Sequence, residues 1–388
     1  MHIPEGVIVA MVTPFDKEGK VNESQVRKFV NVLIDKKVDG LFPVASVGEY
    51  VHMDMSERKY LIDIVADEAN GRIDIIPGTC ATCYQQSIEL ANYAKDKGCA
   101  AIVLSGPYFF KNSEDVVEGH LKKVAESVDI PIFIYNIPFF ANEVTPSMAE
   151  RLCHMPNVIG IKDSSGNMIN VMNLIEMTKK INPNFKVLVG AEEIMLPALL
   201  MGARGSMTSL SGILPEFMTG IWKAFEDGNF NIAHNLQMAV LPLIRKMKSF
   251  NFPQGFKEAL DTRGIEMGPP KMSYPSEQLE KLADLKGKLR IEIQNLLDLY
   301  FPDTPMVYKT SEKQEKFSYP SIPTQSSGKK YPDCNQCGMC LGDRCNESDP
   351  KPLNGQNSLT INDNSQIARG DIERIVADIV KKVINEVR

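Results

Sequence analysis

Between residue 6 and about residue 210 the chain repeats one pattern eight times: a short apolar run rich in β-branched residues, then a longer segment with helical spacing. The apolar runs are continuous and do not alternate with polar residues, which is typical of strands covered on both faces, as in parallel sheets. They read GVIVAMVT, DGLFPVA, IDIIPGT, AAIVLSG, PIFIYN, VIGIKD, FKVLVG and RGSMTSL.

Eight strand and helix units in succession favour a closed (β/α)8 barrel of the α/β class, the TIM barrel. A doubly wound open sheet is the alternative. Such a sheet usually has fewer strands, and no glycine fingerprint of the dinucleotide-binding type follows the first run. We therefore predict a catalytic barrel over residues 1–228.

Three further regions follow the predicted barrel. Residues 229–301 keep a helical spacing beyond what closes a barrel, which predicts a C-terminal helical appendage. Residues 302–370 are rich in proline, serine, asparagine, lysine and glycine, and this composition predicts a disordered linker because it buries too little apolar surface to offset its ordering entropy. Residues 371–388 carry an apolar stripe at helical spacing, which predicts a terminal amphipathic helix capped by Asp371.

The overall composition narrows the class of protein. A hydrophobic fraction of 43% and a charged fraction of 24% are those of a soluble globular protein. A net charge of −6 with interspersed signs gives no electrostatic case for binding nucleic acid or an anionic membrane. No apolar run approaches the roughly 20 residues of a membrane span, and we expect no signal peptide. Eight cysteines in such a chain suggest a reducing cytoplasm.

Reactive side chains stand at the ends of three predicted strands, where a barrel of this kind builds its pocket. These residues are Ser46, Tyr135 and Lys162. A lysine at a strand end against apolar walls loses solvation, which lowers its pKa, and the neutral amine can form a Schiff base with a carbonyl compound. The Tyr135 phenol could then move protons. The alternative is that Lys162 forms a salt bridge with Asp163 or another acid at the barrel rim.

Several short motifs occur in order along the same region: VTPF from residue 12, ASVGE from residue 45, GPYFF from residue 106, YNIP from residue 135 and GIKDSSG from residue 160. With this order and spacing, residues 1 to about 290 resemble the dihydrodipicolinate synthase/N-acetylneuraminate lyase family of pyruvate-handling class I aldolases. The resemblance implies a barrel enzyme that joins or separates a 2-oxo acid and an aldehyde without a cofactor. We also expect a homo-oligomer.

The resemblance assigns a role to each matching residue. Lys162 would be the Schiff-base lysine, Tyr135 the proton donor and acceptor, and Ser46 the hydroxyl that relays protons to the tyrosine. The backbone amides at Ser46 and Val47 would bind the carboxylate of the 2-oxo acid. Met207 would line the same pocket through its backbone.

Three positions depart from the family pattern. Val47 stands where the family usually has a second threonine, Phe109 replaces a tyrosine of the proton relay, and Phe140 replaces an arginine that binds the carboxylate of the aldehyde partner. Loss of that bidentate carboxylate contact argues against a lysine-pathway synthase. Phe139 and Phe140 suggest an uncharged or aromatic aldehyde, unless they only pack a loop. Glu49, Glu192 and Glu193 are interpreted as structural acceptors or helix-start residues, outside the site.

Cysteines fall into two groups. Cys334, Cys337, Cys340 and Cys345 lie close enough together to bind zinc or an iron–sulfur cluster, although free thiols or a redox-sensitive crosslink fit the same spacing. The Cys-x-x-Cys pair at residues 80 and 83 is interpreted as small core residues of the barrel.

The terminal helix is too short to be stable alone, so its apolar stripe needs a partner. Joined to an enzyme by a long linker, it resembles the encapsulation peptides that dock enzymes to the shell proteins of bacterial microcompartments. That resemblance implies a location inside such a compartment in the cytoplasm. The alternatives are a coiled coil or a helix folded back on the barrel.

Taken together, these features predict a Schiff-base aldolase or lyase acting on pyruvate or a related 2-oxo acid. Within the same class, a keto-sugar-acid or sialate-type lyase is the alternative. Outside it, the alternatives are a non-catalytic cargo or scaffold protein working through its cysteine cluster and terminal helix, and an iron–sulfur redox protein.

Overall fold

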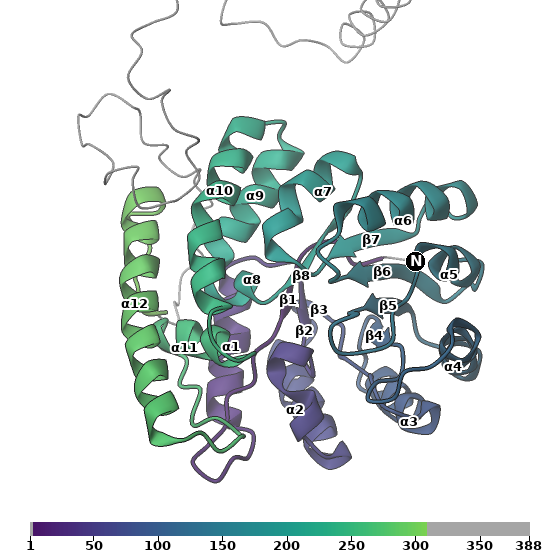
Figure 1. The fold of residues 1–388 in the computed structure, drawn as a ribbon, viewed down its shortest axis with the longest axis horizontal. Helices are drawn as coiled ribbons and strands as arrows, with labels where there is room; N and C mark the ends of the chain where they lie inside the picture. Colours follow the sequence, from purple (N-terminus) through teal and green to yellow (C-terminus); the bar gives the residue numbers. More distant parts are fainter. Residues whose placement is uncertain (1–2, 309–388) are drawn as a thin grey trace, which may run out of the picture. The chain divides into compact units, whose positions relative to one another are not determined.

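A computed structural model describes residues 3–308, which form eight parallel strands surrounded by helices (Figure 1). Neighbouring strands follow the order β3-β2-β1-β8-β7-β6-β5-β4. Each strand coincides with one of the eight apolar runs. Their bounds are β1 Gly6–Ala10, β2 Gly40–Phe42, β3 Asp74–Ile75, β4 Ile102–Ser105, β5 Ile132–Asn136, β6 Val158–Asp163, β7 Lys186–Val189 and β8 Gly205–Thr208.

The two outer strands of this order, β3 and β4, are joined just beyond the end of β3. Gly78 forms a parallel bridge with Val103 of β4. The Val103 amide donates to the Pro77 carbonyl, and the Thr79 amide donates to the Val103 carbonyl, both at 2.9 Å. These bonds close the ring, so the predicted (β/α)8 TIM barrel is confirmed.

The strands are apolar along their whole length because both faces of the sheet are covered. Every residue of β1, β2, β4, β5, β6 and β8 is buried, because side chains fill the barrel on one face of the sheet and helices cover the other. Helix bounds are α1 Glu23–Asp35, α2 Met55–Ala69, α3 Tyr84–Asp96, α4 Glu114–Ser127, α5 Pro146–Leu152, α6 Met168–Ile181, α7 Met195–Met201, α8 Leu210–Ile213, α9 Pro215–Glu226, α10 Phe230–Met247, α11 Gln254–Thr262 and α12 Ser276–Tyr300. Short 3-10 turns occupy Ser46–Gly48, Tyr50–His52 and Glu192–Ile194.

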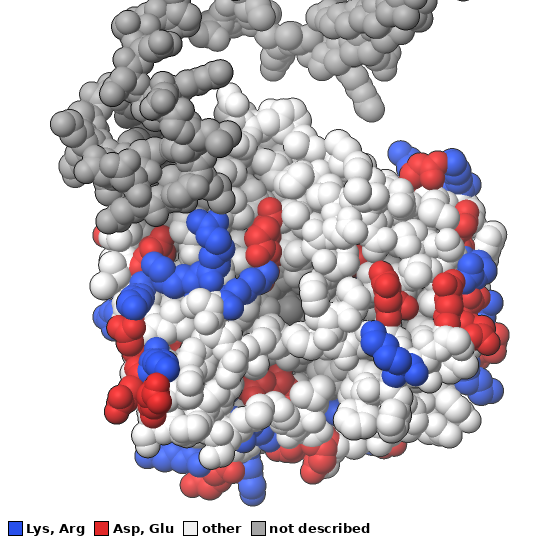
Figure 2. Space-filling view, in the orientation of Figure 1, with Lys and Arg blue, Asp and Glu red and all other residues white. Residues whose placement is uncertain are grey.

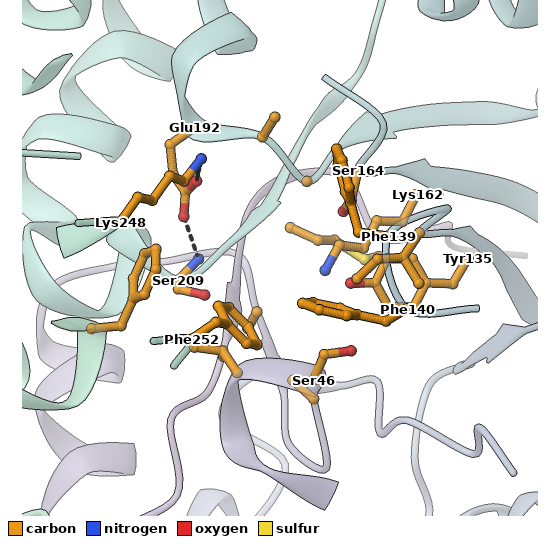
Figure 3. Close-up of a pocket in the computed structure, with 18 residues that line it drawn as sticks. Ser46, Tyr135, Phe139, Phe140, Lys162, Ser164, Glu192, Ser209, Lys248 and Phe252 are labelled. Atoms are coloured by element: carbon orange, nitrogen blue, oxygen red, sulfur yellow. Dashed lines mark hydrogen bonds and ion pairs between the residues drawn. The ribbon is translucent and has the colours of Figure 1, made fainter. Parts of the chain in front are cut away.

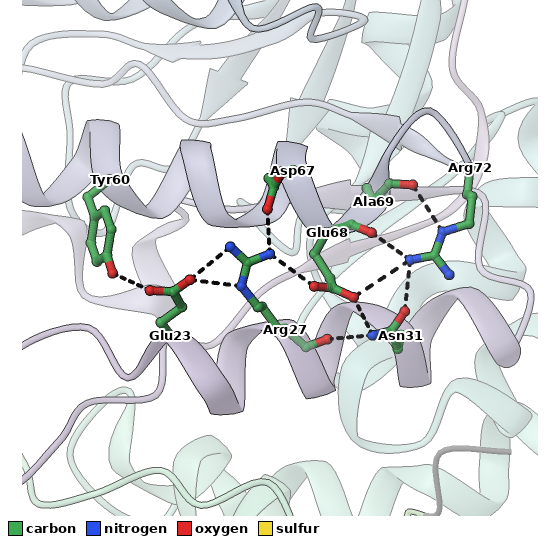
Figure 4. Close-up of polar contacts among 8 residues, drawn as sticks. All are labelled: Glu23, Arg27, Asn31, Tyr60, Asp67, Glu68, Ala69 and Arg72. Carbon is green, nitrogen blue, oxygen red and sulfur yellow. Dashed lines mark hydrogen bonds and ion pairs between the residues drawn. The ribbon is translucent and has the colours of Figure 1, made fainter.

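Polar contacts fix the outer helices against one another. Between α1 and α2, the Arg27 guanidinium lies within 3.0 Å of carboxylates from Glu23, Asp67 and Glu68, and Tyr60 donates to Glu23 (Figure 4). Exposed ion pairs contribute little individually. This network therefore sets the alignment of the two helices more than the stability of the barrel.

Beyond the barrel, α10 packs against α9 and α12, and α11 packs against α12 and α8. These helices match the helical patterns predicted after the eighth strand. In the described part of the chain, no helix is both long and apolar enough to cross a membrane.

Order extends past the expected start of the linker at residue 302. Tyr308 is only 4% exposed, and its hydroxyl lies 2.8 Å from the Ile213 carbonyl oxygen. The Arg263 guanidinium lies 4.1 Å from the Tyr308 ring centroid and pairs with Glu216 at 2.8 Å. Residues 302–308 are therefore not a free linker, because a buried aromatic ring fixes their end. The rest of the predicted linker and the terminal helix lie outside the described residues.

Candidate active site

Lys162 lies inside β6, one residue before its end, and its side chain is buried. Its Nζ atom lies 4.3 Å from the ring centroid of Tyr135 and 4.8 Å from that of Phe42. The neighbouring Asp163 does not pair with it. That carboxylate instead accepts hydrogen bonds from Asn136 at 2.7 Å and Ser165 at 2.6 Å. The expected alternative, a salt bridge between Lys162 and Asp163, is absent from residues 3–308.

This environment changes the chemistry of the amine. Burial lowers the pKa of Lys162 to about 7, with the negative charge of Glu192 acting weakly in the opposite direction. A large fraction of the side chain is therefore neutral at physiological pH. A neutral amine is the form that attacks a carbonyl carbon.

Tyr135 lies directly beside Lys162 because the two residues are paired in register on the adjacent strands β5 and β6. Burial raises the pKa of its phenol, and hydrogen bonding to the side chains of Ser46 and Ser164 opposes that shift. The phenol therefore stays protonated at neutral pH and is connected to two hydroxyl groups. Such a chain of hydroxyls can pass a proton to or from a bound substrate.

Ser46 and Val47 begin the 3-10 turn that follows β2. The turn is closed by hydrogen bonds from the Gly48 amide to the Ala45 carbonyl, at 2.9 Å, and from the Glu49 amide to the Ser46 carbonyl, at 3.0 Å. Among residues 3–308 no acceptor is found for the backbone amides of Ser46 and Val47. Two adjacent amides with free hydrogens suit a carboxylate.

A pocket of about 320 Å³ opens at this end of the barrel. It brings together all five residues expected from the barrel sequence, Ser46, Val47, Tyr135, Lys162 and Met207 (Figure 3). The face shown in Figure 2 is hollowed near its centre, with uncharged residues along its right side and charged side chains at its upper left edge. The other lining residues are Ala10, Ala45, Ile137, Phe139, Phe140, Ser164, Gly190, Ala191, Glu192, Ser209, Lys248, Phe252 and Phe256.

Gly190 follows β7 and passes close to the Lys162 side chain. A Cβ atom at this position would collide with the Ser164 Oγ atom and lie 2.6 Å from the Lys162 Cε atom. Its amide donates to the Asp163 carbonyl at 2.7 Å. Because residue 190 has no side chain, the Lys162 side chain has enough space beside it.

Glu192, which sequence reasoning placed outside the site, lines the pocket. It accepts hydrogen bonds from the Ser209 and Leu210 amides at 3.2 and 3.4 Å, and burial raises its pKa. Lys248 from the segment after α10 lies 3.8 Å away. The strand-end rule could have found Glu192, since it closely follows β7. No such rule points to Lys248, Phe252 or Phe256.

Glu49 is structural, as the sequence suggested, and does not line the pocket. Its carboxylate lies 2.7 Å from the Lys257 Nζ atom and 3.1 Å from the His52 Nδ1 atom. Glu49 and Lys257 are each at most 2% exposed. This buried ion pair joins the loop after β2 to α11.

The cysteine expectations are met only in part. Cys80 is buried, whereas Cys83 is half-buried and is not a core residue. Within residues 3–308 no three histidine, cysteine or acidic side chains gather as they would around a metal ion. The cluster of Cys334, Cys337, Cys340 and Cys345, with its expected zinc or iron–sulfur group, lies outside the described residues.

A desolvated lysine and a tyrosine at the C-terminal ends of adjacent strands place this barrel among the enzymes that build their pocket from strand ends. Residues 3–290 match the model of the dihydrodipicolinate synthetase family, and the chain belongs to that family. At the level of the family, it is a carbon–carbon lyase of the aldolase kind.

Individual relatives carry different activities in their names. The chain is 33% identical over 296 residues to a 4-hydroxy-tetrahydrodipicolinate synthase of Methanothrix thermoacetophila, covering 74% of this chain and 99% of that one. It resembles a prophage protein of the dihydrodipicolinic acid synthase family from E. coli K12, solved in complex with pyruvate, with TM-score 0.70 and 28% identity over 75% of this chain and 98% of that one. A 2-keto 3-deoxygluconate aldolase from Picrophilus torridus has TM-score 0.66 and 25% identity, over 70% and 98% of the two chains.

Proposed function

We propose that this protein is a Schiff-base aldolase that joins pyruvate, or a related 2-oxo acid, to an aldehyde, or cleaves the product. The observation that carries the proposal is the state of Lys162: buried, without a carboxylate partner among the described residues, and 4.3 Å from the Tyr135 ring. The bound pyruvate in the E. coli relative supports the choice of 2-oxo acid.

In the first half of the reaction, the neutral Lys162 amine attacks C2 of pyruvate, one proton is taken up and one water leaves, which gives an iminium ion. The Ser46 and Val47 amides hold the carboxylate, and the backbone of Met207 borders the same space. The iminium withdraws electrons, so a C3 proton can depart and an enamine forms. Tyr135, hydrogen-bonded to Ser46, carries the protons. No cofactor is needed because the lysine itself supplies the electron sink.

In the second half, C3 of the enamine attacks the aldehyde carbon and forms the new carbon–carbon bond. The aldehyde oxygen takes up one proton and becomes a hydroxyl group. Water then hydrolyses the iminium and frees Lys162. The balance is one 2-oxo acid and one aldehyde giving one 4-hydroxy-2-oxo acid, with no net oxidation, and every step can run in reverse.

The aldehyde partner we propose differs from that of a lysine-pathway synthase, although several relatives bear that name. Phe140, at the position where such synthases place their carboxylate-binding arginine, lines the pocket here. A keto-sugar-acid lyase is the second candidate, and the similarity to the Picrophilus aldolase favours it.

Reductive trapping tests the proposal. Pyruvate with cyanoborohydride should leave a reduced pyruvyl group on Lys162, identified by peptide mass spectrometry. Lys162→Ala should show no adduct, while Lys179→Ala, which removes an exposed lysine of α6, should label normally. An unlabelled but folded protein would contradict the proposal and favour the non-catalytic scaffold.

We further propose that residues 371–388 are an encapsulation peptide that binds a microcompartment shell protein in the cytoplasm. The support is the sequence alone: an apolar stripe that includes Ile375, Val376 and Ile379. Residues 370–388 fused to a fluorescent protein should form puncta when shell proteins are co-expressed. The same fusion with Val376→Glu should stay diffuse. Diffuse fluorescence from the unaltered fusion would refute the assignment.

A further inference from the structure

We propose that the aldehyde partner of this site is uncharged and has a flat apolar body of aromatic size. The inference rests on the proposed function, since it concerns the second substrate of the same pocket. Three features of the described residues carry it: a pair of contacting phenylalanine rings, the hydrogen bonds that fix the loop of one of them, and the ion pairs of Lys248.

The first feature is an aromatic clamp, which we define as Phe140 and Phe252. Their ring centroids lie 5.2 Å apart, so the two rings contact each other and form one apolar wall, and the Phe256 ring centroid lies 6.0 Å from that of Phe252. Phe140 is 54% and Phe252 is 46% exposed, and the adjacent Phe139 is 73% exposed. Apolar area left in water at a pocket mouth is a source of binding free energy for a ligand that covers it. A flat ligand can cover more of the surface of a flat ring than a branched ligand can.

The second feature is that the loop carrying Phe140 is held in place before any ligand arrives. The amides of Phe140 and Ala141 donate to the Ile137 carbonyl at 3.0 Å. Further along, the Val144 amide donates to the Asn136 Oδ1 atom at 3.0 Å, and Asn136 in turn donates to the buried Asp163. The loop is therefore tied to the strands that carry Tyr135 and Lys162. A preorganised wall loses little conformational entropy on binding.

The third feature concerns charge. Lys248 is the other lysine that lines the pocket, and its ammonium already lies 2.6 Å from the Glu193 carboxylate and 3.8 Å from that of Glu192. None of the described lining residues is an arginine. A carboxylate on the aldehyde would therefore meet a cation shared with two acids instead of an open one. Such an arrangement selects against anionic partners.

These features also disfavour a polyhydroxylated aldehyde. Hydroxyl groups placed against the exposed faces of the clamp rings would lose hydrogen bonds to water without gaining a polar partner from the rings. Figure 3 shows the polar groups Glu192, Ser209 and Lys248 gathered at one side of the pocket, away from Lys162. The clamp is therefore best matched by an aromatic ring bearing the aldehyde.

The test compares three aldehydes with pyruvate on the full chain: benzaldehyde, succinic semialdehyde as the anionic probe, and glyceraldehyde as the hydroxylated probe. We expect kcat/KM for benzaldehyde to exceed the other two by about tenfold or more, the effect of one well-placed aromatic contact. A preference for succinic semialdehyde or glyceraldehyde would overturn the inference.

Variants locate the effect in the clamp. Phe140→Ala and Phe252→Ala should each raise the KM for benzaldehyde by about tenfold without changing pyruvate labelling of Lys162. Phe140→Arg should shift the preference towards succinic semialdehyde. Phe230→Ala removes a phenylalanine that is 50% exposed at the start of α10 and should leave all three aldehydes unaffected.

The outcomes separate the two proposals. Absence of the pyruvyl adduct on Lys162 would refute the aldolase and the inference with it. Normal labelling combined with unchanged benzaldehyde kinetics in Phe252→Ala would refute only the aromatic partner. Phe252→Ala could instead change the sedimentation coefficient and leave the benzaldehyde kinetics unchanged. The rings would then be a contact surface between subunits, and the inference would again be wrong.

Discussion

At the scale of single residues, the pocket depends on keeping one amine neutral next to one protonated phenol. Both shifts have the same cause, because burial disfavours the charged form of each group and therefore lowers the pKa of Lys162 and raises that of Tyr135. At neutral pH a large fraction of the amine is thus uncharged while the phenol still carries its proton. The two groups need no metal ion or third residue to reach these states.

The pKa of Lys162 predicts the pH dependence of Schiff-base formation. Only the neutral amine reacts, so the trapping rate should fall about tenfold per pH unit well below the pKa and level off above it. Burial lowers that pKa to about 7, so the bend should appear near neutral pH. Initial rates of pyruvate labelling between pH 5 and 9 measure it. A rate that is still rising tenfold per pH unit at pH 9 would mean an ordinary exposed lysine.

Gly190 supplies a second prediction at this scale. Gly190→Ala places a methyl group 2.6 Å from the Lys162 Cε atom, so the amine must move, and pyruvate labelling should slow by roughly 10- to 100-fold. Gly287→Ala is the matched control, since a Cβ there meets nothing within 4 Å. Equal labelling rates in the two variants would show that the Lys162 position is not set by this contact.

Sequence reasoning found the pocket residues around Lys162 and missed most of the others. Tyr135 and Lys162 lie one residue before the ends of their strands and Ser46 lies in the turn after β2, and barrel geometry alone brings such residues together. Phe252 and Lys248 come from a segment beyond the eighth strand, whose path over the pocket follows from tertiary packing. No periodicity along the chain encodes that path.

At the scale of secondary-structure elements, the buried pair of Glu49 and Lys257 connects the loop after β2 to α11. Lys257→Met would leave the buried Glu49 carboxylate with His52, at 3.1 Å, as its remaining side-chain partner, so we expect the free energy of unfolding to fall by about 3 kcal/mol. Urea denaturation measures the change. The double variant Glu49→Gln with Lys257→Met should recover part of the loss.

Lys281→Met provides the control, because Lys281 pairs with Glu277 on the exposed surface of α12 at 2.6 Å. Its denaturation midpoint should match that of the unaltered protein. A similar loss in both lysine variants would mean that the burial of the Glu49 pair has no special effect on stability.

The strands and the long helices were predictable because each is a continuous stretch with one period. The 302–308 segment was not, since its composition is that of a linker. Its order comes from Tyr308, which contacts the Arg263 guanidinium and the Ile213 carbonyl. Both of these residues lie far from Tyr308 in the sequence. A single aromatic residue in a polar segment gives no periodic signal.

At the scale of the whole molecule, two adjacent rings remain exposed in the segment between β4 and α4. Phe109 is 87% and Phe110 is 72% exposed, and the positive φ of 80° at Phe109 is uncommon for a residue with a bulky side chain. We expect a homo-oligomer that buries these rings. Sedimentation velocity should show an assembly, and Phe109→Glu should shift it towards monomer.

In that experiment Met272→Glu is the comparison, because Met272 is also exposed, at 57%, but lies in the segment between α11 and α12. Its sedimentation should equal that of the unaltered protein. A monomeric unaltered chain would contradict the assembly outright.

The two halves of the pocket have different anchors. The amine and phenol stand on hydrogen-bonded strands, whereas Phe252 belongs to a connection between α10 and α11 that forms no part of the barrel. If the proposed reaction is correct, changes in that connection should alter which aldehyde is accepted while the enamine is made as before. A laboratory selection for new carbon–carbon bonds would then best begin by randomising residues 248 to 256.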